Sequence, residues 1–182
     1  MGLTSSLQRG FLKTPKTLSV ASLYSIGVPL SCTAPTNASS AWGTANLALY
    51  VPFFVTEPLI VVQMFALNAG AVNGNIDVGI YGSTGTRLVS LAPAAASGAN
   101  TIQTFNITDT TLQPGLYYMA LSNSGTTHTF LSIIPSADAV DVIRTMGVFV
   151  ETSAGTLPAT ATFAANTQAF IPYFGLTAES VL

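Results

Sequence analysis

The clearest pattern of apolar and polar positions lies in the middle of the chain. Ile76, Val78 and Ile80 alternate with small or polar residues, and an alternation with a period of two places these three side chains on one face of a β-strand. The segment 83–86 (STGT) separates this strand from the apolar segment 87–91. Two short strands joined by a glycine-containing turn predict a β-hairpin.

Further strands are predicted on both sides of this hairpin, from runs of β-branched, aromatic and alternating residues between turn signals. They cover residues 18–30, 45–56, 59–67, 101–107, 116–121 and 127–134. The segments 113–115 (QPG) and 123–125 (NSG) predict turns, and the strand that follows the second turn is expected to pair back onto the strand before it. With the hairpin this makes about eight strands, at the spacing typical of a β-sandwich or jelly roll.

Three segments depart from the strand pattern. Residues 31–44 are rich in Ser, Thr, Asn, Pro and Gly and read as a loop, and residues 109–115 read as the approach to a turn. Residues 136–146 place apolar side chains at helical spacing behind Ser136, which can cap a helix N-terminus. The pattern therefore predicts one short helix late in the chain.

The two ends of the chain differ from its body. Residues 1–18 show no sustained period and are expected to form an extended N-terminal arm that docks on a neighbour. Residues 19–182 are expected to form a single domain, a mainly β, jelly-roll-like antiparallel sandwich. Its last part, about residues 160–182, reads as an apolar tail whose aromatic side chains pack on the body or on a neighbouring subunit.

The amino-acid composition indicates a role for this fold. Charged residues make up 7% of the chain, hydrophobic residues 49%, and the net charge is −2. With so few charges the exposed positions must be filled mainly by Thr, Ser, Asn, Ala and Gly, and such a surface gives little protection against self-association. The composition therefore favours a subunit of an assembly over the alternative, an extracellular β-domain with a neutral polar surface.

The basic residues are concentrated in the arm. Arg9, Lys13 and Lys16 precede a body that holds two arginines against seven acids, so the net charge of the body is 2 − 7 = −5. A basic arm suits docking on an acidic neighbour, whereas three charges are too few to predict nucleic-acid binding. The candidate docking residues are Arg9, Lys13, Lys16, Phe170, Tyr173 and Phe174.

Cysteine usage and hydropathy exclude two other kinds of protein. Cys32 is the single cysteine, so neither an internal disulfide framework nor a cysteine-based zinc site is possible. No stretch approaches the roughly 20 uninterrupted apolar residues of a transmembrane helix. Serine, glycine and proline interrupt the segment before Cys32, so we do not interpret it as a secretory or lipoprotein signal, and we expect no membrane insertion.

The candidate chemistry is sparse. His128 is the only histidine; it is expected at the surface in a polar turn, with no nucleophile or carboxylate placed for a catalytic triad. Asp138 and Asp141 lie on the predicted helix without the spacing of a calcium-binding loop. Asp77 is expected either to face solvent or, as we favour, to be buried against Arg87 in a cross-strand pair of the hairpin. We therefore predict no catalytic, cofactor-binding or metal-binding residues, and no enzyme.

Two aromatic residues support a different class of function. Trp42 and an outward-facing Tyr118 could stack on a sugar ring if the fold placed them together in a groove. A carbohydrate contact at these residues is therefore the alternative to core packing and subunit contact.

Several segments resemble a known group of proteins. The resemblance covers roughly residues 42–122, is carried by glycine-bounded hairpins and a Pro-Gly turn, and extends more loosely to residues 157–158 and 171–175. The segments that carry it are 50–53 (YVPF), 73–81 (NGNIDVGIY), Gly85, 88–90 (LVS) and 112–121 (LQPGLYYMAL). They look like β-sandwich virion structural proteins of tailed bacteriophages.

The resemblance implies a function but no functional residues. The residue after Tyr81 is often acidic in these proteins, whereas Gly82 stands there in this chain. The expectation is a non-enzymatic virion protein, a capsid, head-decoration or tail component, that forms a homo-oligomer and contacts other virion proteins. The alternative is a carbohydrate- or receptor-binding module at a virion tip, with a host-surface glycan as its partner.

Overall fold

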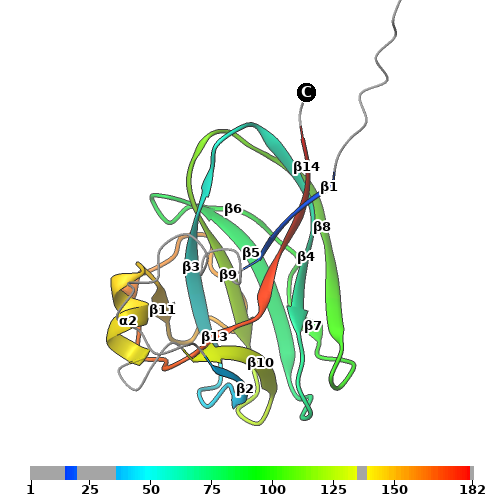
Figure 1. Cartoon of the computed structure of the whole chain (residues 1–182), viewed down its shortest axis with the longest axis vertical. Coiled ribbons are helices and arrows are strands. Elements are labelled where there is room, and N and C mark those ends of the chain that lie inside the picture. Colours follow the sequence, from blue (N-terminus) through cyan, green and yellow to red (C-terminus); the bar gives the residue numbers. More distant parts are fainter. Residues whose placement is uncertain (1–14, 20–35, 135–138, 181–182) are drawn as a thin grey trace, which may run out of the picture.

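Antiparallel strands form three sheets, two of which face each other across a common core (Figure 1). The structure, a computed structural model, describes residues 15–19, 36–134 and 139–180. Within these residues it contains many strands and one short helix. The predicted mainly β sandwich is therefore confirmed.

The four-stranded sheet combines the two ends of the described chain with two strands from its middle. Every neighbouring pair in it is antiparallel. Its order is β1 (Pro15–Ser19), β14 (Phe174–Ser180), β4 (Leu59–Leu67) and β8 (Ile102–Leu112).

The seven-stranded sheet contains the predicted hairpin, β5 and β6. Its central strand pairs are β3 with β9 and β9 with β5, both antiparallel. The order along the sheet is β12 (Ala164–Ala165), β11 (Phe149–Glu151), β3 (Leu47–Val55), β9 (Gly115–Asn123), β5 (Asn75–Gly82) and β6 (Arg87–Ser90), with β7 (Ala94–Ala95) pairing with β5.

A three-stranded sheet lies at one end of the sandwich (Figure 1). It consists of β13 (Ile171–Pro172), β10 (Thr129–Ile134) and β2 (Thr36–Ala41). The helix α2 (Ala139–Thr145) lies beside β11 and turns the buried Ala139 and Ile143 toward the core. Its first predicted residues, 136–138, lie outside the described part of the chain.

The alternation of residues in β5 determines which side chains enter the core. Ile76, Val78 and Ile80 are fully buried between the two large sheets, as predicted. Met119 and Leu121 of β9 lie on the same face. Because side chains in a strand alternate between faces, the residues between these positions belong to the outer face of the seven-stranded sheet.

Three predicted elements differ from the structure. Residues 36–41, predicted as loop, form β2, since their backbone pairs with β10 even though their side chains do not alternate in hydropathy. β10 was expected to pair with the strand at 116–121 and instead pairs with β2 and β13. β8 continues to Leu112, through residues predicted as the approach to a turn.

The two ends of the chain lie next to each other in one sheet. β14 is a core strand of the apolar tail predicted for residues 160–182, since Phe174, Leu176 and Ala178 are fully buried. β1 runs along β14 and across the predicted boundary between the arm (1–18) and the body (19–182). Residues 1–14 and most of the predicted strand at 18–30 lie outside the described part of the chain.

Candidate functional site

A group of buried and half-buried titratable side chains, which does not include His128, lies on the outer face of the seven-stranded sheet, under the segment that joins β11 to β12. We call this segment, residues 152–163, the strap. A second apolar cluster lies beneath it and contains Tyr50, Tyr81, Tyr118 and Leu157. Both faces of the central strands are therefore buried, one by the opposite sheet and one by the strap.

Asp77 and Arg87 hold the strap at one residue. The backbone N–H of Leu157 donates to Asp77 Oδ2 over 2.9 Å, and the Arg87 guanidinium donates to the carbonyl oxygen of the same residue. The backbone of Arg87 also donates to Ala159 O at 2.9 Å. The direct cross-strand ion pair favoured from the sequence is therefore replaced by an arrangement in which both charged groups bind the strap backbone.

Burial disfavours the charged form of Asp77. Loss of water raises the pKa of this carboxyl, while the backbone N–H of Leu157 and the charge of Arg87 act in the opposite direction. A carboxyl whose pKa is raised by folding favours the folded state at low pH, and this contribution is lost as the pH rises through the folded pKa. Asp77 is thus costly to keep ionised, and the hydrogen bond to Leu157 offsets part of the cost.

Two tyrosines and a glutamate hold the next residues of the strap. The Tyr81 hydroxyl donates to Pro158 O at 2.6 Å. Glu151 Oε2 accepts from the Tyr50 hydroxyl at 2.8 Å and from the backbone N–H of Thr162 at 2.9 Å. Burial raises the pKa of both tyrosines, so that their hydroxyls remain protonated and act as donors.

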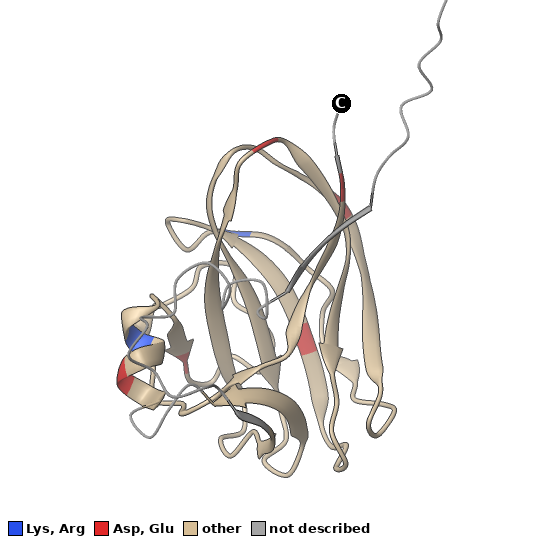
Figure 2. Cartoon of the chain, viewed as in Figure 1, with Lys and Arg blue, Asp and Glu red and all other residues tan. Residues whose placement is uncertain are grey.

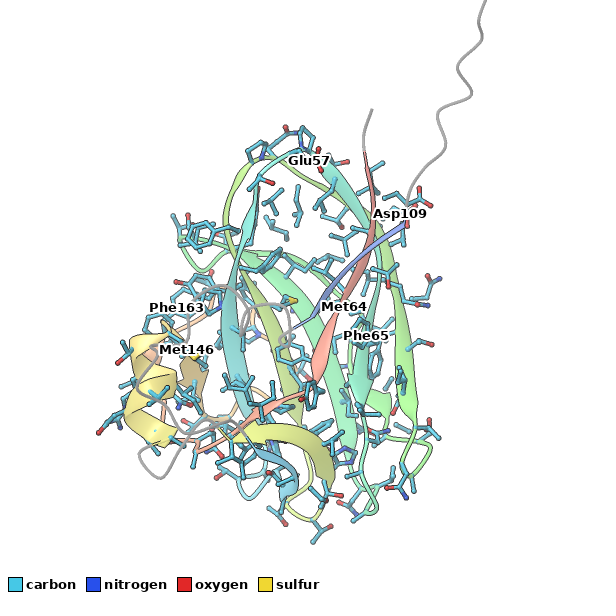
Figure 3. All side chains as sticks on the ribbon, in the orientation of Figure 1. Glu57, Met64, Phe65, Asp109, Met146 and Phe163 are labelled. Atoms are coloured by element: carbon cyan, nitrogen blue, oxygen red, sulfur yellow. The ribbon has the colours of Figure 1, made fainter. Side chains whose placement is uncertain are left out.

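An aromatic side chain at the end of the strap completes the cover. The ring of Phe163, labelled in Figure 3, lies 4.6 Å from that of Tyr118, 5.0 Å from that of Phe149 and 5.3 Å from that of Tyr50, centroid to centroid. Asp77, Arg87, Tyr81 and Glu151 all bind backbone atoms of the strap. The arrangement acts as a clamp on the strap, and the local sequence pattern did not predict it.

His128 is buried rather than exposed, which corrects the sequence prediction. The residue is 0% exposed, packs with its ring tilted against that of Phe130 at 4.2 Å between centroids, and accepts a hydrogen bond at Nδ1 from the backbone N–H of Asn73 over 3.2 Å. Burial lowers its pKa, because the protonated ring would lose its hydration there. His128 was predicted at the surface because the sequence around it is polar. It is buried because the turns at 68–74 and 123–128 cover each other.

The burial of His128 predicts a loss of stability in acid. Because folding lowers its pKa, the unfolded chain takes up this proton more readily, so the free energy of unfolding falls as the pH drops below about 6.5. His128→Asn keeps an acceptor for Asn73 and does not titrate. The free energy of unfolding, measured with urea at about pH 7 and about pH 5, should fall less between these two pH values for the variant than for the wild type. An equal fall for both proteins would show that another group is responsible.

Trp42 and Tyr118 do not form a sugar-binding groove. Trp42 is 1% exposed and packs in the main core, with its ring 5.4 Å from that of Phe130 and 6.4 Å from that of Phe170. Tyr118 is 8% exposed and belongs to the cluster under the strap. The two residues therefore lie on opposite faces of the seven-stranded sheet, and neither presents a ring surface to a ligand.

The predicted docking residues fall into three groups. Arg9 and Lys13 lie outside the described residues, and Lys16 lies in β1. Phe170 packs on Trp42, and Tyr173 is half-buried with its backbone N–H donating to Leu131 O at 2.8 Å. Phe174 is fully buried in β14 and has no surface to offer a neighbour. The aromatic residues of the predicted tail thus serve the core of their own chain.

A shallow pocket opens where β4 meets the three-stranded sheet. Its volume is about 310 Å³. Asn68 is buried there, and its amide nitrogen donates to Ser97 O at 2.7 Å and to Gln103 Oε1 at 3.1 Å, which ties the loop at 92–100 to the sheet. The pocket is lined by Ser39, Leu67, Asn68, Ala69, Gly70, Asn100 and Leu131.

Within the described residues, no three His, Cys, Asp or Glu side chains are grouped so that they could hold a metal ion. The same part of the chain has no helix with the length and apolar character needed to span a bilayer. Comparison of the sequence with protein-family models and with curated proteins finds no match.

Proposed function

We propose that this chain is a non-enzymatic structural protein of a tailed-bacteriophage virion, a capsid, head-decoration or tail component. It assembles with copies of itself and with neighbouring virion proteins, through an uncharged β-sandwich surface and its basic N-terminal arm. The motifs that resemble virion proteins support this proposal, since they lie in four consecutive strands of the seven-stranded sheet, β3, β9, β5 and β6.

The observation that carries the proposal is how few charges the folded surface displays. Figure 2 shows isolated charged segments on an otherwise uncharged ribbon. Asp77 is buried and Arg87 is bound to the strap, so neither keeps neighbouring molecules apart. Asp141 and Arg144 largely neutralise each other at 3.1 Å. A surface with so little charge opposes contact weakly and suits permanent association.

Large apolar side chains are exposed on this surface. Phe54 is 71% exposed, Ile102 61% and Leu88 45%. Phe54 lies on the outer face of β3, opposite the half-buried Leu116 of β9. Covering such side chains in a subunit interface would contribute roughly 25 cal/mol for each Å² of apolar surface buried.

The buried polar cluster also suits a structural role. Its carboxylates, its arginine and Tyr81 bind the backbone of the strap, and Tyr50 binds the carboxylate of Glu151, so these groups are committed to holding the fold. A clamp of this kind stabilises the face on which Phe54 lies without demanding a surface charge. The proposal therefore assigns the cluster to stability.

Self-association should be insensitive to salt. Contacts made of apolar and uncharged polar groups hardly weaken when the Debye length shrinks from about 10 Å at 0.1 M salt to about 3 Å at 1 M, whereas exposed ion pairs contribute only about 0–1 kcal/mol each. Sedimentation velocity of a chain that lacks residues 1–14 should give the same oligomer at about 0.1 M and 1 M salt. The full chain should dissociate from an acidic partner as salt rises, because it keeps Arg9 and Lys13.

The truncated chain should melt at the temperature of the full chain, which serves as the control for folding. A monomer at both salt concentrations and high protein concentration would contradict self-assembly. Immunogold labelling of purified phage particles then tests the virion assignment, and an oligomer that never labels particles would contradict it.

A further inference from the structure

β1 is held in the sandwich by one neighbouring strand. It pairs antiparallel with β14, from Pro15 opposite Glu179 to Ser19 opposite Gly175, and forms the edge of the four-stranded sheet. Among the described elements, β14 is the only one that β1 contacts extensively. Main-chain pairing along β14 is therefore what places β1 in the fold.

Without β1, the outer edge of β14 would be left without a hydrogen-bonding partner. On its other side β14 pairs with β4, and Phe174, Leu176 and Ala178 are fully buried. An unpaired edge next to such a core strand would present a row of free N–H and C=O groups, which is a template for another strand. The edge is satisfied equally well by β1 of the same chain and by β1 of another copy.

The connection after β1 is long enough for either arrangement. Residues 20–35 separate β1 from β2, and β2 belongs to a different sheet. A segment of this length can span about 50 Å when extended. β1 is thus not tied to β14 by a tight turn, and a connection of this length lets β1 reach the β14 of a neighbouring copy as well as its own, as the exchange of an element between identical chains needs it to do.

The charges favour the entry of β1 at the same end of any copy. Glu57 and Asp109 lie at the end of the molecule where β1 begins, as Figure 3 shows, and Glu179 lies opposite Pro15. The basic residues Arg9, Lys13 and Lys16 lie before and within β1. Opposite charges on the strand and on the end that receives it guide the encounter and fix its register.

We propose that β1 is an exchanged strand: in the assembly, residues 15–19 of one copy pair with β14 of a neighbouring copy. This inference rests on the proposed self-assembly and gives its mechanism, with a second copy of this chain as the partner. The closed and exchanged forms contain the same strand pairs, so the high local concentration inside an assembly favours the exchanged form.

A mixed cross-linking experiment tests the exchange. Two full-length variants are prepared on a Cys32→Ser background, one with Thr17→Cys and the other with Thr177→Cys, and they carry tags of different size. Thr17 and Thr177 are directly opposite in the register, and opposite residues of antiparallel strands lie about 4.5–5.5 Å apart between Cα atoms, within the range of a disulfide. After co-refolding and mild oxidation, a non-reducing gel should show a covalent heterodimer.

The matched control replaces the second partner with Thr104→Cys, which is exposed on β8 at the opposite edge of the same sheet. Its mixture with Thr17→Cys should lose the heterodimer band. Heterodimer bands of equal intensity with both partners would overturn the exchange. So would the absence of a heterodimer when a Thr17→Cys/Thr177→Cys double variant forms its disulfide within one chain. Sedimentation of the same samples separates the two proposals: an oligomer without the heterodimer contradicts only the exchange, and a monomer contradicts self-assembly as well.

Discussion

Replacing Ile80 with aspartate should abolish cooperative folding of the chain. Ile80 is 0% exposed, lies on β5 between β9 and β6 of the seven-stranded sheet, and is opposite Val89 of β6 and Met119 of β9. A buried carboxylate without a partner costs several kcal/mol, and the total stability of a domain is only about 5–15 kcal/mol. Circular dichroism should show no cooperative thermal transition, or one shifted far below that of the wild type.

Leu88→Asp is the matched control on the same hairpin. Leu88 is 45% exposed, so the introduced carboxylate stays in water, and a surface substitution of this kind usually changes stability by about 0.5 kcal/mol or less. The control should melt close to the wild-type temperature. An Ile80→Asp protein that melted with an unchanged midpoint would mean that the inner and outer faces of β5 are reversed.

The second large effect is expected at Gly74, where two turns touch. Its φ is +78°, and a Cβ added there would lie 2.5 Å from the backbone nitrogen of Gly125 and 2.8 Å from Asn123 Oδ1. Gly74→Ala therefore forces a left-handed backbone on a residue with a Cβ, at a cost of about 1–2 kcal/mol. It also inserts a methyl group against backbone that has little room to move, at a cost of about 1–3 kcal/mol. Urea unfolding should show that the free energy of unfolding falls by nearly the sum of these two costs.

Gly70→Ala makes the same chemical change in the same loop. Gly70 does not have a positive φ, and a Cβ added to it meets no atom within 4 Å, since it faces the shallow pocket. The substitution should leave stability unchanged or raise it by about 0.4–1 kcal/mol, because alanine has fewer unfolded conformations to lose. Equal losses for both variants would show that Gly74 is not confined by its contact with Gly125.

The sequence by itself determined the local elements and the faces they bury. The alternation of Ile76, Val78 and Ile80 identified the core face of β5, and the apolar run at Leu59–Leu67 coincides with β4. The helical spacing late in the chain agrees with α2. These predictions are confirmed because the burial of one face of a strand or helix depends on the period of its own residues.

Only the tertiary structure decided what covers the second face and which strands pair. The sequence predicts that Asp77 either faces solvent or, as favoured, pairs with Arg87 across the hairpin, whereas in the structure the strap, which lies far from it in the sequence, covers it and binds it through Leu157. β2 has no apolar alternation and forms a strand only because β10 pairs with its backbone. His128 is buried by a turn remote in sequence. Such contacts join residues separated by long stretches of chain, and the local period of a segment carries no information about its distant partner.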